Sequence, residues 1–310
     1  PPPPPPPAFF FSPPIRQSEI PLRLVGSEMC IRDRIMAVQE VSIMEESTLL
    51  SEVIDRIAWI TFNNPARMNA MSQEMWDNSA ALLDKYAKDD NVRAIVLRGA
   101  GNKAFVAGAD ISKFGSERAS KEAMISYDKS VAGFHSSLNA VAKPTIAQVN
   151  GYCIGGGLAI AIGCDIRICS EKSTFGVPAA KLGIGYKAKG IRELERLVGP
   201  AFTAEIFYTA RQFSAEEARI MGLVNRVVNE VDLESTVGDM IARIARNAPL
   251  SIKAVKESLI ETGKPESEWD LSAHEATVKQ CQTSADYTEG RTAFMEKRLS
   301  LIHISEPTRR

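Results

Sequence analysis

Hydrophobic and polar positions along most of the chain follow two alternating periods, one typical of strands and one typical of helices. Short β-branched runs predict buried strands at residues 56–62, 94–97, 145–149, 165–169 and 224–228. Between the first two runs, helical spacing of three and four residues is kept by Met75, Ser79, Leu82, Leu83 and Tyr86. The same spacing over residues 124–141 predicts a second helix. This alternation indicates an α/β fold.

The pattern changes near residue 214. Ser214 and Glu217 have the spacing of a capping box, and Gly222 is placed to end the helix that they begin. Residues 232–298 consist almost entirely of amphipathic helical sequence. We therefore expect an α/β core over residues 36–231, followed by a helical region over residues 232–298.

The two ends have an unusual composition. Ten of the 17 prolines lie before residue 22, which would suit a polyproline II arm. A second interpretation fits better, because one strand of a single oligonucleotide can encode residues 299–309 while its complementary strand can encode residues 24–34. That oligonucleotide resembles a sequencing adapter. We therefore expect residues 1–35, disordered, and residues 299–310 to be non-native read-through, and exclude them from the fold.

Charge and cysteine content narrow the class of protein. The chain has 37 Lys and Arg against 38 Asp and Glu, so no nucleic-acid partner is expected. No apolar run reaches the ~18 residues of a membrane-spanning helix, so no membrane partner is expected either. Four cysteines lie between the two excluded ends, lack a paired spacing and indicate reduced thiols in a cytoplasmic protein: Cys153, Cys164, Cys169 and Cys281. Neither a CxxC motif nor a histidine cluster suggests a metal site.

The most unusual local sequence is a run of three glycines, Gly155, Gly156 and Gly157, between a predicted strand and an apolar helix. It lacks the Lys-Ser/Thr of a phosphate loop and the spacing of a dinucleotide fingerprint. It does present bare backbone N–H groups at a helix N-terminus. Residues 105–111 form a second turn of small residues. Two converging N–H groups would make an oxyanion hole for a thioester enolate; the alternative is that both are simply close-packed turns.

Several motifs follow one another in a fixed order. Residues 105–111 read Phe-Val-Ala-Gly-Ala-Asp-Ile, and residues 143–157 contain Lys-Pro-x-Ile-Ala-x-Val-Asn-Gly-x-x-x-Gly-Gly-Gly. Cys-Asp and Phe-Gly-x-Pro come next, and the match continues through residues 209–218 to residues 289–298. Together these motifs resemble the enoyl-CoA hydratase/isomerase (crotonase) superfamily over roughly residues 57–298.

The resemblance implies a fold, an assembly and a substrate. The fold would be an α/β crotonase spiral of ββα turns, with C-terminal helices that build a homotrimer or a dimer of trimers. The substrate would be an acyl-CoA thioester, with its oxygen held by the N–H groups of Ala109 and Gly156 and with no cofactor beyond the coenzyme A that it carries. Phe294 and Lys297 would reach the nucleotide of a neighbouring subunit; the alternative for Lys297 is a solvated charge at a helix end. The remaining implied substrate contacts are Ala66, Arg67, Met68, Ala107, Asp110, Ile111 and Gly155.

Two positions depart from the family. Hydratases carry glutamates two positions after the glycine run and directly after Phe-Gly-x-Pro, where this chain has Ala159 and Ala179. A methyl group cannot transfer a proton, and each general acid or base contributes about 10²–10⁴-fold in rate. The resemblance therefore implies an oxyanion apparatus without the standard two-glutamate hydration.

Tyr186 suggests a different reaction. Its Leu-Gly-x-x-Tyr setting, beginning at Leu182, is similar to methylmalonyl-CoA decarboxylase, in which a tyrosine at the aligned place holds the substrate carboxylate. Lys187 or Lys189 could help to bind that carboxylate, although solvated charges are the alternative. Against this reaction, the decarboxylase has a histidine where Ala109 stands and a glutamate where Ala159 stands. Tyr186 could also be an amphipathic pocket wall.

Three functions therefore remain open: a hydratase/isomerase-family enzyme with non-standard chemistry, a decarboxylase of the methylmalonyl type, and a non-catalytic acyl-CoA-binding protein. Other polar residues are expected to play structural parts. Asp110 is expected in a turn that starts a helix, Asp165 at a strand entry, and His274 among the C-terminal helices. His135 is expected to be exposed, and Cys153 to be a buried apolar filler.

Overall fold

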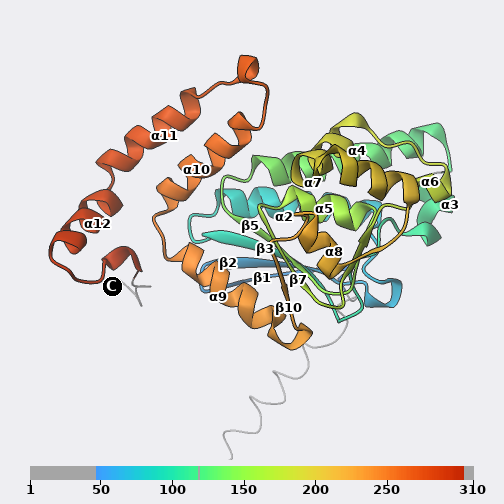
Figure 1. Ribbon diagram of the computed structural model, residues 1–310, viewed down its shortest axis with the longest axis horizontal. Helices are drawn as coiled ribbons and strands as arrows, with labels where there is room; N and C mark the ends of the chain where they lie inside the picture. The colour runs from blue at the N-terminus through green and yellow to red at the C-terminus, as the bar shows by residue number, and fades with distance from the viewer. Residues whose placement is uncertain (1–46, 118, 304–310) are drawn as a thin grey trace, which may run out of the picture. The chain divides into compact units, whose positions relative to one another are not determined.

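The computed structural model describes residues 47–117 and 119–303, which belong to one compact unit (Figure 1). Residues 1–35 and most of residues 299–310, which we interpret as read-through, lie outside the described residues. Residues 299–303 are described and include the short 3-10 helix η5 (Leu301–His303). Of the helices within the described ranges, none combines the length and the apolarity needed to cross a bilayer.

A six-stranded sheet forms the first layer, in the order β1-β2-β3-β5-β7-β10. Strand β1 pairs antiparallel with β2, and all the other neighbours are parallel. In this register Ile60 of β2 lies beside Leu97 of β3, and both side chains are completely buried. The strands span Leu49–Ile54 (β1), Ile57–Phe62 (β2), Ala94–Gly99 (β3), Thr145–Val149 (β5), Ile166–Ser170 (β7) and Arg226–Val228 (β10).

A second sheet of four short strands runs in the order β4-β6-β8-β9. Its strands span Ala104–Val106 (β4), Tyr152–Ile154 (β6), Thr174–Gly176 (β8) and Phe213–Ser214 (β9). Three strands of the first sheet are each followed by a short strand of the second and then by helix: β3 by β4 and later α4, β5 by β6 and α5, and β7 by β8 and α6. The chain therefore advances as a repeated ββα turn, and the ends of β4 and β6 come together because those strands pair in parallel.

Helices cover the sheets, with α2 and α4 packed side by side (Figure 1). The α-helices are α2 (Gln73–Lys88), α3 (Phe114–Glu117), α4 (Lys121–Ala140), α5 (Gly156–Gly163), α6 (Ala179–Leu182), α7 (Ala188–Thr209), α8 (Ala215–Ile220), α9 (Leu233–Ala245), α10 (Pro249–Thr262), α11 (Ser272–Thr283) and α12 (Ala285–Met295). The remaining 3-10 helices are η1 (Pro65–Arg67), η2 (Ile111–Lys113), η3 (Glu230–Asp232) and η4 (Glu266–Glu268). Trp76, Leu83, Phe134 and Leu138 of α2 and α4 are buried in the main hydrophobic core.

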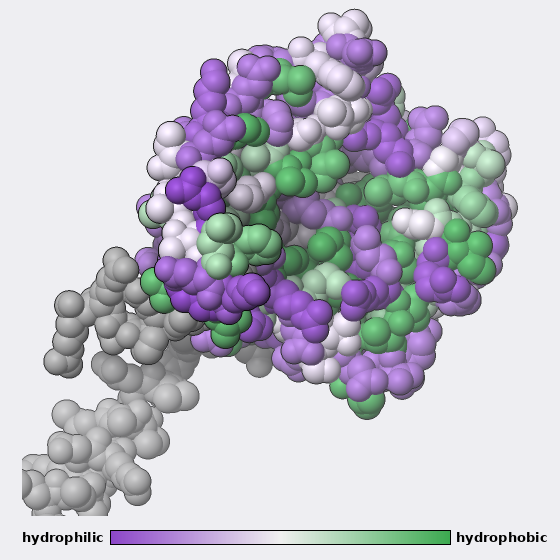
Figure 2. Space-filling model, turned by 60° about the vertical axis from the view of Figure 1, so that its left-hand side comes forward, coloured by the Kyte–Doolittle hydropathy of each residue, from purple (hydrophilic) through white to green (hydrophobic). Residues whose placement is uncertain are grey.

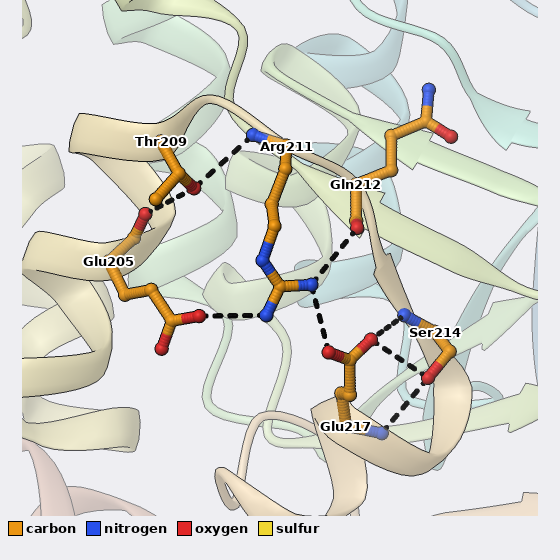
Figure 3. Close-up of polar contacts among 6 residues, drawn as sticks. All are labelled: Glu205, Thr209, Arg211, Gln212, Ser214 and Glu217. Carbon is orange, nitrogen blue, oxygen red and sulfur yellow. Dashed lines mark hydrogen bonds and ion pairs between the residues drawn. The ribbon is translucent and has the colours of Figure 1, made fainter.

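Arg211 joins the end of α7 to the start of α8 (Figure 3). Its guanidinium donates to Glu205 Oε1 at 2.7 Å and to Glu217 Oε1 at 2.8 Å. The other carboxylate oxygen of Glu217 accepts from the backbone N–H of Ser214, while Ser214 Oγ accepts from the Glu217 N–H. The predicted capping box is therefore confirmed, and the arginine extends it to the preceding helix.

The C-terminal helices begin with α9, which packs on β2, β3, β5 and β7 of the large sheet. After it, α10, α11 and α12 pack mainly on one another. Helix α10 is tied to the core by Lys256, whose ammonium donates to Asp165 Oδ2 and to the Lys143 carbonyl, both at 2.8 Å. Asp165 Oδ2 also accepts from the Thr145 N–H at 2.7 Å, so Asp165 holds the entry of β5 as expected.

The predicted secondary structure agrees with the fold at its main elements. The run at 56–62 forms β2, and the helix expected over residues 124–141 is α4, three residues longer at its start. Gly222 adopts φ 78° just after α8, as a helix-ending glycine should. His274 Nδ1 lies 2.9 Å from the Ala254 carbonyl, which links α11 to α10 and gives this histidine the structural part expected of it.

Candidate active site

The glycine run turns the chain from β6 into α5. Gly155 is the N-cap of α5 with φ 56° and ψ −112°, a backbone conformation that residues with a β-carbon rarely adopt. Its own N–H donates to the Gly176 carbonyl at 2.8 Å. A β-carbon on Gly157 would lie 2.0 Å from the Val106 carbonyl oxygen, so only glycine allows α5 to pack this closely on β4. The two outer glycines are therefore structural.

Gly156 is the first residue of α5, and its N–H is one that a helix leaves unbonded. Among the described residues, no hydrogen bond uses it. The position of a β-carbon on Gly156 is 3.4 Å from Trp76 Cζ2 and 3.8 Å from Gly108 Cα. Gly156 therefore faces the indole of α2 and the turn that follows β4.

Ala109 lies in that turn, paired with Met71 in a short parallel bridge. The Met71 N–H donates to the Gly108 carbonyl at 2.8 Å, and the Met71 carbonyl accepts from the Asp110 N–H at 2.9 Å. Met71 thus bonds to the two residues that flank Ala109. In a parallel bridge, the N–H of a residue flanked in this way points to the opposite side of its strand. The Ala109 N–H is therefore turned away from Met71. Because Gly108 lies beside Gly156, the two predicted donors belong to adjoining backbone segments.

The loop before α2 is held against the same turn by Asn69, which is completely buried. Asn69 Nδ2 donates to the carbonyls of Ala104 at 2.7 Å and Ala100 at 3.0 Å. The Ala107 N–H donates to the Met68 carbonyl at 3.1 Å. A cavity of about 300 Å³ opens beside this loop, lined by Pro65, Ala66, Met68, Asn69, Ala100, Gly101, Asn102, Lys103 and Ala104. Ala66, Met68 and Ala107, all predicted substrate contacts, therefore lie on or beside the wall of one cavity.

Asp110 and Arg67 connect the two loops, with Arg67 Nη1 3.4 Å from Asp110 Oδ1. Asp110 is buried, and its carboxylate also accepts from the Ser112 N–H and hydroxyl at 3.0 and 2.7 Å. Burial raises the pKa of Asp110, but the Ser112 hydrogen bonds and the charges of Arg67 and Lys113 outweigh it, so the net pKa is lowered. An ionised carboxylate whose Oδ1 already accepts hydrogen bonds is better suited to stabilising a turn than to acting as an acid catalyst. Ile111 is 70% exposed at the start of η2.

Ala159 and Ala179 lie on different helices of the site. Ala159 is half-buried in the first turn of α5, three residues after Gly156, and Ala179 is the buried first residue of α6. Trp76 fills part of the space beside α5, and its Nε1 donates to the Tyr127 hydroxyl at 3.1 Å. Trp76 was not predicted as a site residue, because no motif includes it and an apolar side chain in a predicted helix is an ordinary core position.

His135 is not exposed, so that prediction was wrong. The imidazole is half-buried, with its ring centroid 6.1 Å from that of Trp76 and 5.4 Å from that of Phe134. A β-carbon on Gly163 of α5 would lie 4.0 Å from His135 Nδ1. Burial, with a smaller contribution from the charge of Lys189, lowers the pKa of His135 to about 4. The helical period places His135 off the apolar stripe of α4, but α5 packs along that edge of the helix and covers the imidazole.

Tyr186 lies just before α7, with its ring packed on Phe207 at a centroid distance of 4.9 Å. It remains 36% exposed, and burial raises the pKa of its phenol. Within the described ranges, no hydrogen bond uses its hydroxyl. Lys187 is committed to an ion pair with Asp128 of α4 at 2.8 Å, whereas Lys189 is close enough to His135 to affect its charge.

Phe294 and Lys297 lie at the end of α12, which packs on α11 and η5. Phe294 is 82% exposed. Figure 2 shows hydrophobic surface around a hollow on the face where these helices come forward. Exposed apolar residues of this region are Val255, Leu259, Ile260, Phe294, Met295, Leu299 and Leu301.

The buried cysteines have unreactive surroundings. Cys153 is completely buried behind the glycine run, and burial strongly raises the pKa of its thiol. Burial also raises the pKa of Cys164 and Cys169 to about 12. A thiol that stays protonated is a poor nucleophile, so Cys153 fills space as expected.

Comparisons with known proteins agree with this geometry. The family model for enoyl-CoA hydratase/isomerase matches residues 52–301. The chain is 34% identical over 260 residues to a short-chain-enoyl-CoA hydratase of Clostridium acetobutylicum, covering 82% of this chain and 97% of that protein. It is 34% identical over 245 residues to a carnitinyl-CoA dehydratase of Salmonella paratyphi A, covering 77% of this chain and 92% of the other.

Among solved structures, an enoyl-CoA hydratase/carnithine racemase from Magnetospirillum magneticum matches with a TM-score of 0.76 and 34% identity. The match covers 82% of this chain and 94% of that one. The crotonase fold expected from the motifs is therefore confirmed. The chain belongs to the enoyl-CoA hydratase/isomerase family.

Proposed function

We propose that the protein is an acyl-CoA enzyme that stabilises a thioester enolate between the N–H groups of Ala109 and Gly156. The supporting observation is the placement of these donors: the bridge to Met71 turns one away from its neighbour, and the helix start leaves the other unbonded. Preorganised backbone donors of this kind are typically worth about 2.7–4 kcal/mol each in the transition state. Similarity to proteins named enoyl-CoA hydratases favours a thioester substrate.

The coenzyme A part would lie along the loop of Ala66, Arg67 and Met68, beside Ala107 and the 300 Å³ cavity. Lys103 lines that cavity and supplies a positive charge for a phosphate. Phe294 and Lys297 would complete the nucleotide site of a neighbouring subunit. The exposed apolar residues of α10 and α12 support assembly through this region, as a homotrimer or a dimer of trimers.

Proton transfer in this enzyme would not use the two-glutamate arrangement, because residues 159 and 179 are alanines. Hydration or isomerisation through the enolate then requires another group, or a water, to move the proton at the carbon next to the thioester.

Decarboxylation is a second candidate, favoured by Tyr186, whose ring packs on Phe207 and whose hydroxyl has no hydrogen bond among the described residues. In that reaction the C–C bond to the carboxylate breaks, carbon dioxide leaves, and the electron pair becomes the enolate held by Ala109 and Gly156. A proton from water then completes the product. No base is needed to remove a carbon-bound proton, which suits a site with Ala159 and Ala179.

A panel of thioesters tests these proposals: 2-enoyl-, 3-enoyl-, 3-hydroxyacyl- and methylmalonyl-CoA, followed by mass spectrometry. Gly156→Pro removes one donor N–H at a helix position where proline is tolerated. Because proline also adds a β-carbon that faces Trp76, the matched control is Gly156→Ala, which keeps the N–H. Turnover that falls further in Gly156→Pro than in Gly156→Ala, with unchanged thermal unfolding, would support the oxyanion hole; equal turnover in the two variants would refute it. Carbon dioxide release that Tyr186→Phe abolishes would select the decarboxylase. Binding of acyl-CoA without turnover of any thioester would show a non-catalytic binding protein.

A further inference from the structure

His135 and Trp76 lie side by side along one face of α5. Trp76 is next to Gly156, and His135 is next to Gly163, as the contacts of a β-carbon built at each glycine show. Gly156, Ala159 and Gly163 are spaced by three and four residues, so they share a face of the helix. Ala159 therefore lies between the two glycines on the face that the indole and the imidazole cover. Its methyl group occupies the position of one of the family's two glutamates.

The imidazole is a polar group without a polar partner in the part of the chain that the structure describes. Its close neighbours are the rings of Trp76 and Phe134 and the bare backbone of Gly163. A ring nitrogen that packing partly shields from water costs free energy unless it finds a hydrogen-bond partner. A substrate oxygen or a water beside Ala159 would provide that partner.

Burial, helped by the positive charge of Lys189, keeps this imidazole neutral. Helix α5 presents glycine and alanine to it, α2 presents the uncharged indole of Trp76, and α7 presents Lys189. Glu193 is one turn beyond Lys189; burial raises its pKa, against the lowering effect of Lys189 and Arg196. At neutral pH one ring nitrogen can therefore accept a proton, which a protonated imidazole could not do.

Building on the proposed function, we propose that His135 is the proton-transfer residue of this site and acts on 2-enoyl and 3-hydroxyacyl thioesters. In hydration, an O–H bond of water breaks as the water oxygen bonds to C3. The proton moves to the imidazole and the electron pair of the double bond becomes the enolate held by Ala109 and Gly156. The imidazolium then returns its proton to C2, so one water is added and the histidine is regenerated. The reverse sequence removes water.

The decisive variant is His135→Gln, which keeps a polar side chain but cannot accept a proton in this pH range. We expect kcat for crotonyl-CoA hydration to fall by about 10²–10⁴-fold with KM little changed, and the acid limb of the pH profile to disappear. Lys189→Gln should instead keep the limb and move it to higher pH, because removing a positive charge raises the pKa of His135. His274→Gln, in a histidine that links α10 to α11, is the matched control and should hydrate crotonyl-CoA at the wild-type rate.

A second readout does not depend on turnover. In ¹⁵N-histidine NMR of the full chain, the signal missing from the His135→Gln spectrum is that of His135. It should shift when 3-hydroxybutyryl-CoA is added, but not when coenzyme A alone is added. An unchanged signal, or unchanged kcat and acid limb in His135→Gln, would overturn the role of His135 while leaving the oxyanion proposal intact. Turnover of methylmalonyl-CoA and of no other thioester would also overturn the role of His135. Loss of all turnover in Gly156→Pro, by contrast, tests only the oxyanion hole and not the role of His135.

Discussion

The indole of Trp76 lies directly against the α-carbon of Gly156, with Cζ2 3.4 Å from the place that a β-carbon would occupy. This contact fixes the wall beside a proposed oxyanion donor. It also joins α2, which carries no predicted chemistry, to α5, whose first N–H has no hydrogen bond among the described residues. The geometry of the site therefore depends on a residue that the motifs do not include.

Gly156→Ala should lower turnover while keeping the N–H. The added methyl group would press on Trp76, and displacements of about 1 Å near a reacting centre can cost about 10²-fold in rate. Trp76→Phe removes the atom that the methyl group meets, so the double variant should recover part of the lost kcat. Equal kcat values for Gly156→Ala with and without Trp76→Phe would show that the contact does not transmit the effect.

Gly157→Ala should destabilise the fold, because its β-carbon would lie 2.0 Å from the Val106 carbonyl oxygen. Overpacking of this kind costs about 1–3 kcal/mol or more. Gly133 of α4 is the matched control, since a β-carbon there meets nothing within 4 Å. Gly133→Ala should raise the free energy of unfolding by up to about 1 kcal/mol. Urea unfolding measures both, and equal effects would contradict the close approach of α5 to β4.

The stability of the protein should depend on pH through His135. Burial lowers its folded pKa from 6.5 to about 4, so the unfolded chain binds a proton in this range that the folded chain does not. The free energy of unfolding should therefore fall as the pH drops from 6.5 towards 4, by up to about 3 kcal/mol at 1.36 kcal/mol per pKa unit. Denaturant unfolding of wild type and His135→Gln at several pH values checks this. If the two slopes are the same, the imidazole is not held neutral.

Lys256→Met should loosen α10. The ammonium of Lys256 donates to Asp165 Oδ2 and to the Lys143 carbonyl, and its side chain is only 11% exposed. Its loss leaves the Lys143 carbonyl without this donor and leaves Asp165 Oδ2 with only its hydrogen bonds from Thr145, at a cost of about 1–3 kcal/mol. Hydrogen exchange should rise in α10 and α11. Lys253→Met, which removes a more exposed pair with Glu257, is the control and should change exchange little. Equal exchange in the two variants would remove Lys256 as the anchor.

The principal strands and helices could be predicted from sequence because their periods are long enough to recognise. β2, β3, β5 and β7 are runs of five or six residues. The strands of the second sheet contain two or three residues each, too few to show a period, so they were missed. β1 was missed for another reason: five of its six residues are exposed, and an edge strand that faces solvent lacks the apolar run of a buried one.

In the candidate site, too, some residues could be recognised from the sequence and others could not. Its donors are backbone groups, and the turns that present them require glycine at Gly155 and Gly157, so their signature is visible in the sequence. Trp76 and His135 have no such signature, because each is an ordinary member of a helix until another helix packs against it.

The sequence by itself determined the family, the glycine turns and the absence of both glutamates, because each depends on residue type at a fixed spacing. Tertiary structure decided what lies around Ala159. The helical period of α4 places His135 one residue from the apolar stripe, where a side chain can be either exposed to solvent or buried. Packing of α5 against that edge buries the imidazole beside Trp76 and makes it neutral. Burial depends on contacts between elements far apart in the chain, and no local pattern records them.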